Sequence, residues 1–197
     1  MVKLGEVCII NPPKSEVAKL DPQTEISFVP MSVLSEHQSS FSPPDTRIIQ
    51  EVVKGYTYFR DGDVLLAKIT PCFENGKAGV AAGLKNGIGF GSTEFIVLRP
   101  NYERILRNLV YHFISSAKFR KRGIAYMTGS AGQQRIPASF VESYEIPLPP
   151  LEEQERIVSE LEGCRKVIEG ARDLISRMEA KIRVKLAEVW GDSDNAA

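Results

Sequence analysis

Cysteine is scarce in this chain, and the three that are present, Cys8, Cys72 and Cys164, lie far apart. No two of them form a CxxC pair, so the sequence predicts neither a disulfide framework nor a zinc site. Histidine is scarcer still, because His37 and His112 are isolated from each other and from any serine or cysteine signature of nucleophilic catalysis. We therefore assign no catalytic residue, no metal ligand and no bound cofactor.

The chain also lacks long hydrophobic runs. No stretch approaches the roughly 18 consecutive apolar residues of a membrane span, and residues 1–5 lack the long apolar segment of a signal peptide. These absences predict a cytoplasmic protein with no membrane partner. Its 197 residues are enough for one ordinary domain with an extension.

Net charge is zero, but the balance differs along the chain. Residues 1–149 hold 17 Lys and Arg against 14 Asp and Glu, whereas residues 150–197 hold 8 against 11. A basic run follows Glu103, at Arg104, Arg107, Lys118, Arg120, Lys121 and Arg122. Such a cluster is suited to phosphate contacts. The apolar stripe of the same segment is equally consistent with a solvated helix face.

Three motifs resemble enzyme signatures without their context. Residues 11–14 read Asn-Pro-Pro-Lys, where adenine methyltransferases have an aromatic residue last, and too little chain precedes them for a glycine-rich cofactor loop. Residues 179–181 mimic a nuclease acid-x-Lys motif on a helix. The glycine-rich residues 87–91 lack a following helix and lysine, so we expect a loop between strands there. A stand-alone methyltransferase or nuclease is therefore a remote alternative.

Strand-like patterns dominate the first half of the chain. Residues 25–31, 64–69, 79–82 and 94–98 are predicted strands, and residues 106–123 are a predicted helix. The Asn75-Gly76 pair is of the kind favoured in tight hairpins.

Polar loops separate these elements. Asp61-Gly62-Asp63 is a strong turn signal. Residues 128–135 form a loop rich in glycine, and its Gln and Arg side chains match the donor and acceptor patterns of base edges.

A proline-rich junction then leads into a long charged helix. Residues 139–146 are strand-like, and Pro147, Pro149 and Pro150 forbid helix before Leu151. From there about 38 residues would form a rod of roughly 57 Å, which is too long for a body of this size to cover. Its heptad seam consists of Ile157, Leu161, Cys164, Ile168, Ala171, Ile175, Met178, Ile182 and Val189.

These patterns predict an α+β protein, in which a β-rich globular body precedes a long C-terminal coiled-coil helix. The residues alone indicate a binding module that pairs through this helix. A coiled-coil adaptor whose body binds a protein is the main alternative to a nucleic-acid-binding module.

An ordered series of motifs points further. It comprises residues 59–71 (FRDGDVLLAKITP), 75–77 (NGK), 91–95 (GSTEF), 128–130 (TGS) and 146–154 (IPLPPLEEQ). Together these resemble the specificity subunit of type I restriction-modification systems, over nearly the whole chain. The run that ends a target recognition domain and opens the spacer helix, here residues 147–154, is the most specific of them.

The resemblance implies a target recognition domain at residues 1–149, a spacer and dimerisation helix at 150–190 and a tail at 191–197. The common family form carries two recognition domains and two helices, and this chain has one of each, so we expect a half subunit or a fragment. A half subunit would pair its helix antiparallel in a homodimer that reads an interrupted palindrome.

The resemblance also implies partners. Modification subunits would methylate adenine with S-adenosylmethionine, an ATP-dependent restriction subunit would cleave, and this chain would bind double-stranded DNA. The candidate DNA contacts are Lys68, Lys77, Arg120, Lys121, Arg122, Gln133, Gln134 and Arg135. The cations would mostly engage phosphates, whereas Gln133, Gln134 and Arg135 are suited to reading bases. The motifs at 61–63 and 128–130 are more typical of turns than of DNA contacts.

Overall fold

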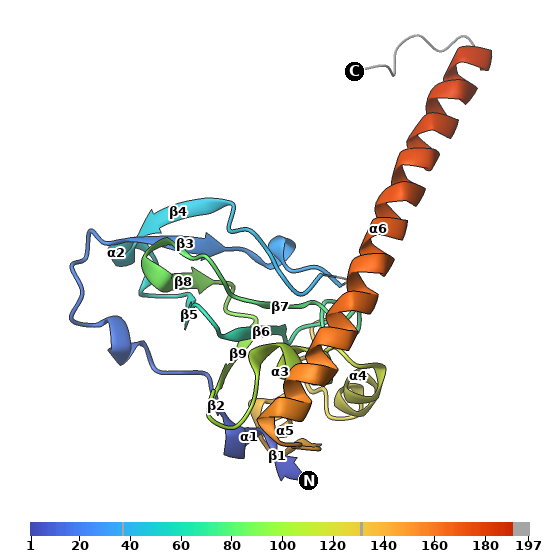
Figure 1. Ribbon diagram of the computed structural model, residues 1–197. Coiled ribbons are helices and arrows are strands. Elements are labelled where there is room, and N and C mark those ends of the chain that lie inside the picture. Colours follow the sequence, from blue (N-terminus) through green and yellow to red (C-terminus); the bar gives the residue numbers. More distant parts are fainter. Residues whose placement is uncertain (37, 131, 191–197) are drawn as a thin grey trace. The chain divides into compact units, whose positions relative to one another are not determined.

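The structure is a computed structural model that describes residues 1–36, 38–130 and 132–190 (Figure 1). His37, Ala131 and the predicted tail at 191–197 lie outside the described residues. Two compact units, Met1–Arg156 and Ile157–Ala197, make up the chain.

Two four-stranded sheets form the centre of the first unit. The first sheet has the strand order β2-β9-β6-β7, in which β2 spans Cys8–Ile10, β9 Phe95–Pro100, β6 Val64–Ala67 and β7 Ala78–Val80. All neighbouring strands within this sheet pair antiparallel. Every residue of β6 and β9 is buried, so both strands read as continuous apolar runs with little polar alternation.

The second sheet has the strand order β4-β3-β8-β5. Its strands are β4 (Asp45–Ile48), β3 (Glu25–Val29), β8 (Ile88–Gly91) and β5 (Thr57–Arg60). The β3–β8 pair is parallel, and the others are antiparallel. The strands of both sheets are interleaved along the sequence, so the two sheets belong to one folding unit.

Strand β8 corrects the prediction of a loop at residues 87–91. Glycine is common in loops, but at positions 89 and 91 of this sheet only glycine, which has no side chain, fits. A Cβ at Gly89 would clash with the ring of Phe59, and one at Gly91 would clash with the carbonyl oxygen of Val29. Neighbouring strands therefore require glycine here.

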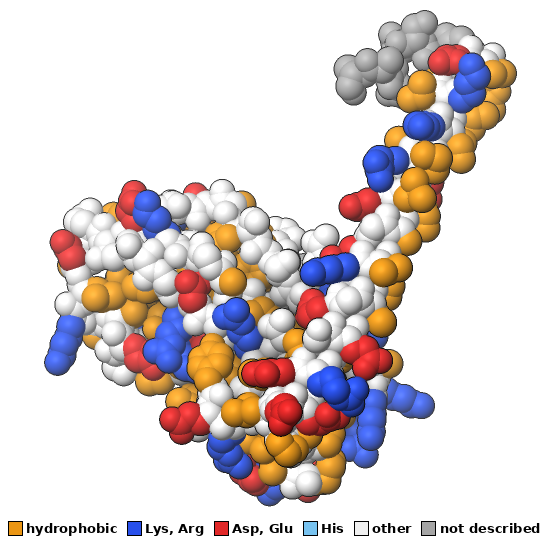
Figure 2. Space-filling model, viewed as in Figure 1, with side chains coloured by type: hydrophobic (Ala, Val, Ile, Leu, Met, Phe, Trp, Pro, Cys, Tyr) orange, Lys and Arg blue, Asp and Glu red, His pale blue; other side chains and the backbone are white. Residues whose placement is uncertain are grey.

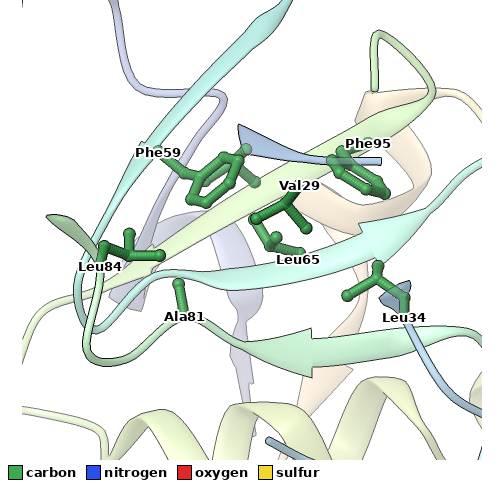
Figure 3. Close-up of a cluster of buried hydrophobic side chains, with 8 residues drawn as sticks. Val29, Leu34, Phe59, Leu65, Ala81, Leu84 and Phe95 are labelled. Carbon is green, nitrogen blue, oxygen red and sulfur yellow. The ribbon is translucent and has the colours of Figure 1, made fainter. Parts of the chain in front are cut away.

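A hydrophobic core cluster joins the two sheets (Figure 3). Val29 and Phe59 of the second sheet pack against Leu65 and Phe95 of the first. Because strand side chains alternate in direction, the residues next to them along β3 and β5 face the other way. These form a second cluster with helix α2 (Ile49–Val52) and the short helix η1 (Lys14–Val17).

The predicted helix at 106–123 is two helices. Helix α3 spans Arg107–Ile114 and α4 spans Ala117–Ile124, with Ser116 between them in an extended conformation. The hydroxyl of Ser116 accepts a hydrogen bond from the Phe119 amide at 3.2 Å, which caps α4. The apolar periodicity runs through both helices, so it does not reveal the break.

The predicted strand at 139–146 is also mostly helical. Helix α5 spans Ala138–Ser143, and only Glu145–Ile146 are extended, as strand β10. Strand β10 pairs with β1 (Val2–Lys3), which leads into helix α1 (Leu4–Val7). The remaining short helices are η2 (Met31–Val33) and η3 (Lys85–Gly87).

Helix α6 spans Leu151–Trp190, which confirms the predicted start at the proline junction. Glu152 and Glu153 occupy its first turn, where negative charge interacts favourably with the helix dipole. Among the described residues, no helix is long and apolar enough to cross a membrane.

Candidate nucleic-acid interface

Two polar segments are joined beside the first sheet. The loop at 128–135 closes through reciprocal hydrogen bonds, in which Thr128 N donates to Arg135 O at 3.0 Å and Arg135 N donates to Thr128 O at 2.8 Å. It attaches to the segment after β6 because Thr70 N donates to Gln134 O at 2.9 Å and Ile136 N donates to Lys68 O at 3.0 Å. The fold thus brings together four predicted contacts, Lys68, Gln133, Gln134 and Arg135.

An ion cluster fixes this junction. The Arg135 guanidinium donates to both carboxylate oxygens of Glu94, at 2.8 and 2.7 Å, and its third nitrogen donates to the carbonyl oxygen of Gln133 at 2.9 Å. The Lys68 ammonium lies 3.9 Å from Glu94. Hydrogen bonding by Arg135, with the charge of Lys68, holds the pKa of Glu94 below its usual range although burial opposes the shift.

The loop residues differ in how much of each side chain remains available to a ligand. Three of the five N–H donors of the Arg135 guanidinium hold the loop, and two remain. Gln133 is exposed and Gln134 is half-buried. Base reading by Gln133, Gln134 and Arg135 stays a prediction.

Helix α4 borders the same segment from another side. The Phe73 and Phe119 rings pack with centroids 6.1 Å apart, and the Arg120 guanidinium lies against Gly76, where an added Cβ would be 2.7 Å from it. Arg120 also donates to Ser115 O. Lys77, which is half-buried, ends the loop through a hydrogen bond from its amide to Cys72 O at 2.9 Å.

The remaining predicted cations of α4 face solvent. Lys121 and Arg122 are exposed, and the Arg122 guanidinium lies 5.8 Å from the centre of the Tyr144 ring. Exposed cations on a helix are of the kind that contacts a phosphate backbone, and phosphate contacts by α4 stay a prediction.

The Asp61–Asp63 turn is structural, in agreement with the turn interpretation. Asp61 accepts a hydrogen bond from Leu84 N at 3.0 Å, and Asp63 is 1% exposed. Two hydrogen bonds of 2.7 and 2.8 Å join Asp63 to Arg99, which is itself 4% exposed and also contacts Glu16 at 2.6 Å. The predictions from sequence do not include this network, although Arg99 at the end of the apolar run 95–98 indicates it, since buried charges need partners.

Gln154 is a second residue whose role the sequence did not reveal. It is completely buried in the first turn of α6. Its oxygen accepts from Leu106 N at 3.0 Å, and its nitrogen donates to Arg104 O at 2.8 Å and Pro149 O at 2.9 Å. The amide thus binds three backbone groups and makes the start of α6 part of the first unit.

The second unit carries the predicted seam on one helix, and Figure 2 shows apolar side chains gathered along one edge of that helix. Leu161, Ile168, Ile175, Met178, Ile182 and Val189 are large apolar residues with 37 to 71% of their surface exposed. The other seam residues are half-buried Ile157 and exposed Cys164 and Ala171. Exposed apolar side chains in heptad spacing require a partner helix for burial.

The described part of the chain offers no metal site, and its buried thiol is unreactive. No group of three or more His, Cys, Asp or Glu side chains is placed there to hold a metal ion. Burial raises the pKa of the Cys8 thiol to about 12, so this cysteine is not a reactive thiolate.

Solved structures share this fold. The HsdS subunit from Thermoanaerobacter tengcongensis matches with a TM-score of 0.70 and 23% identity, over 100% of this chain and 50% of that chain. A chain from a structure on complex assembly and conformational transition of the type I R-M system matches with a TM-score of 0.73 and 23% identity, over the same shares.

Two curated relatives are the EcoAI and EcoEI specificity subunits of type I restriction enzymes from Escherichia coli. The chain is 47% identical to the first over 155 residues, 79% of this chain and 26% of that protein. It is 48% identical to the second over 157 residues, 80% of this chain and 26% of that protein. It thus spans about a quarter of their length. The family model for the type I restriction modification DNA specificity domain matches residues 1–177, which include the sheets, the polar loops and most of α6, and the chain belongs to this family.

Proposed function

We propose that this chain is the DNA-recognition part of a type I restriction-modification specificity subunit. The match of one DNA specificity family model to both the body and most of α6 carries this proposal. The joined loops at 68–77 and 128–135 and the basic edge of α4 would contact duplex DNA. Their other cations would mostly bind phosphates, and Gln133, Gln134 and Arg135 would read bases.

Catalysis would belong to partner subunits. Modification subunits would methylate adenine with S-adenosylmethionine, and an ATP-dependent restriction subunit would cleave the DNA in the cytoplasm. The proposal gives this chain the choice of site. This division of roles rests on the family.

Helix α6 would pair two copies of the chain. Its exposed seam would pack antiparallel against the same seam of a second copy, which places a recognition domain at each end of the pair. The length of the rod would then set the distance between two half-sites.

The apolar face of α6 is wider than a two-helix seam in its middle part. Val167 and Leu174, which are 72 and 52% exposed, precede seam residues Ile168 and Ile175. A helix in a two-stranded coil uses two apolar positions in each heptad, whereas a helix in a bundle uses three. This width supports docking of a further helix beside the partner copy, and we assign it to a modification subunit.

A direct binding measurement tests the proposal. Fluorescence anisotropy of a labelled random-sequence duplex, titrated with the chain across a series of salt concentrations, should show binding that weakens steeply as salt rises. Absence of binding to the duplex at low salt, with and without the modification subunit, would instead support the protein-binding adaptor.

A further inference from the structure

An open groove lies in the first unit, next to the joined loops. Its volume is about 390 Å³. The groove is lined by Asn11, Pro12, Lys14, Gly55, Tyr56, Thr57, Tyr58, Lys68, Thr93 and Phe95. Tyr58 and Phe95 are buried, whereas Asn11 and Thr93 are exposed, so the groove has an apolar base and a polar rim.

Two lysines in this lining are held in place by the backbone. The Lys14 ammonium donates to the carbonyl oxygen of Val53 at 3.0 Å, and the Lys68 ammonium donates to that of Thr93 at 2.8 Å. An ammonium has three N–H donors, so each lysine keeps donors for a ligand. Fixing the side chains in advance also lowers the entropy cost of binding one.

The charge around the groove favours an anion. Its lining residues include two cations and no acid. Of the nearby carboxylates, Glu16 is bound by Arg99 and by the Tyr58 hydroxyl at 3.0 Å, and Glu94 is bound by Arg135. Neither carboxylate is therefore an unpaired negative charge beside the groove.

The groove is continuous with the proposed DNA interface. Lys68 lines the groove and also lies 3.9 Å from Glu94, which holds the loop at 128–135 through Arg135. An open polar groove with fixed ammonium groups and threonine hydroxyls fits a chain of phosphodiesters better than an enclosed small molecule.

We propose that this groove binds the phosphate backbone of one strand of the duplex, and that Lys14 is one of its phosphate contacts. The inference rests on the proposed function. Lys14 is the residue at which residues 11–14 depart from the methyltransferase motif. In the fold, Asn11 adopts a φ of 51°, which turns the chain after β2 and places Pro12 and Lys14 in the groove lining.

Charge substitution at Lys14 tests the inference. Lys14→Gln should reduce the slope of log affinity against log salt concentration by about 0.9, the contribution of one phosphate contact, for random and selected duplexes alike. Lys14→Arg should retain the slope because it keeps the charge. Lys19→Gln is the matched control, since Lys19 is an exposed lysine of the same segment that does not line the groove.

A scan of single phosphates in the duplex tests which phosphate Lys14 contacts. A set of duplexes, each with one phosphate neutralised as a methylphosphonate, should include one that weakens binding of the wild type but not of Lys14→Gln. If the affinity of Lys14→Gln depends on salt as steeply as that of the wild type, the inference is overturned and the proposed function stays intact. Equal losses in Lys14→Gln and Lys14→Arg would also overturn it, because the loss would then come from the bond to Val53. A wild type that binds no duplex would overturn both proposals.

Discussion

Individual charged residues hold the loops of this protein in place. Arg99 joins Asp63 at the turn before β6 to Glu16 near the N-terminus, and Arg135 joins Glu94 to the loop at 128–135. Arg99 binds Asp63, and Arg135 binds Glu94, through two nitrogens each, which fixes geometry as well as charge. At the residue scale, the loops are therefore positioned by the fold before any ligand arrives.

Gln154 should be among the residues most important for stability. Gln154→Ala removes the partners of Leu106 N, Arg104 O and Pro149 O, and should lower the free energy of unfolding by about 2–3 kcal/mol, because buried polar groups are left unpaired. Urea denaturation followed by circular dichroism measures this. Glu155→Ala, at the exposed next position, is the control. A loss below about 0.5 kcal/mol would contradict the role given to Gln154.

Glu94 should make stability depend on acidic pH. Its pKa is lowered in the fold by the Arg135 hydrogen bonds and the Lys68 charge. A depressed carboxylate pKa stabilises the folded state above the unfolded pKa of about 4.3, and this contribution is lost as pH falls through the folded value. The stability difference between wild type and Glu94→Gln should therefore be constant near neutral pH and shrink below about pH 4.3.

Urea denaturation at a series of pH values would measure this difference. Glu145→Gln, at an exposed position of β10, serves as the control. A difference that is independent of pH across the acidic range would show that the Glu94 carboxylate gains nothing from its two cationic neighbours.

At the scale of elements, helix α4 should contribute general affinity for DNA and no sequence preference. Replacing Lys121 and Arg122 with Gln should weaken binding to all duplexes and lower the salt slope by about 1–2, because two exposed cations are lost. A double Lys3→Gln and Lys19→Gln variant controls for total charge. An unchanged slope in the α4 variant would remove this helix from the interface.

Helix α6 should carry the dimer. Ile168→Asp with Ile175→Asp puts two charges into the exposed apolar seam, and should convert dimers to monomers in sedimentation experiments without unfolding the body. The matched control is Lys166→Asp with Ala180→Asp, which places the same residues on the opposite side of the heptad. The seam account fails if the seam variant sediments as a dimer.

The elements differ in how well the sequence predicts them. Helix α6 was predictable because the prolines fix its start and the heptad pattern fixes its length. Strand β8 was not, because Gly89 and Gly91 are required by Phe59 and Val29, which are distant in sequence. The break at Ser116 escaped notice for a similar reason, since one apolar stripe serves both α3 and α4.

The candidate site was predictable in outline only. The loop at 128–135 and the cations near it could be identified by composition, but their pairing could not. The bidentate pair between Arg135 and Glu94, 41 residues away, cannot be read from the sequence. Lys14 becomes a candidate phosphate contact only in the folded protein, where Lys68 and Thr93 line the same groove.

At the scale of the whole molecule, the chain combines one β-rich body with one long helix, and it belongs to the DNA specificity family. We propose that the body selects the DNA sequence and that α6 pairs two bodies. Affinity would then come from the cations around the joined loops, specificity from the polar side chains within them, and half-site spacing from the helix.

The most direct test is a selection from randomised duplex DNA. The purified chain, alone and with its modification subunit, would be mixed with the duplex pool, and the retained DNA would be sequenced. The account predicts enrichment of an interrupted palindrome, with two identical half-sites at a fixed spacing. No enrichment, even with the modification subunit present, would contradict it.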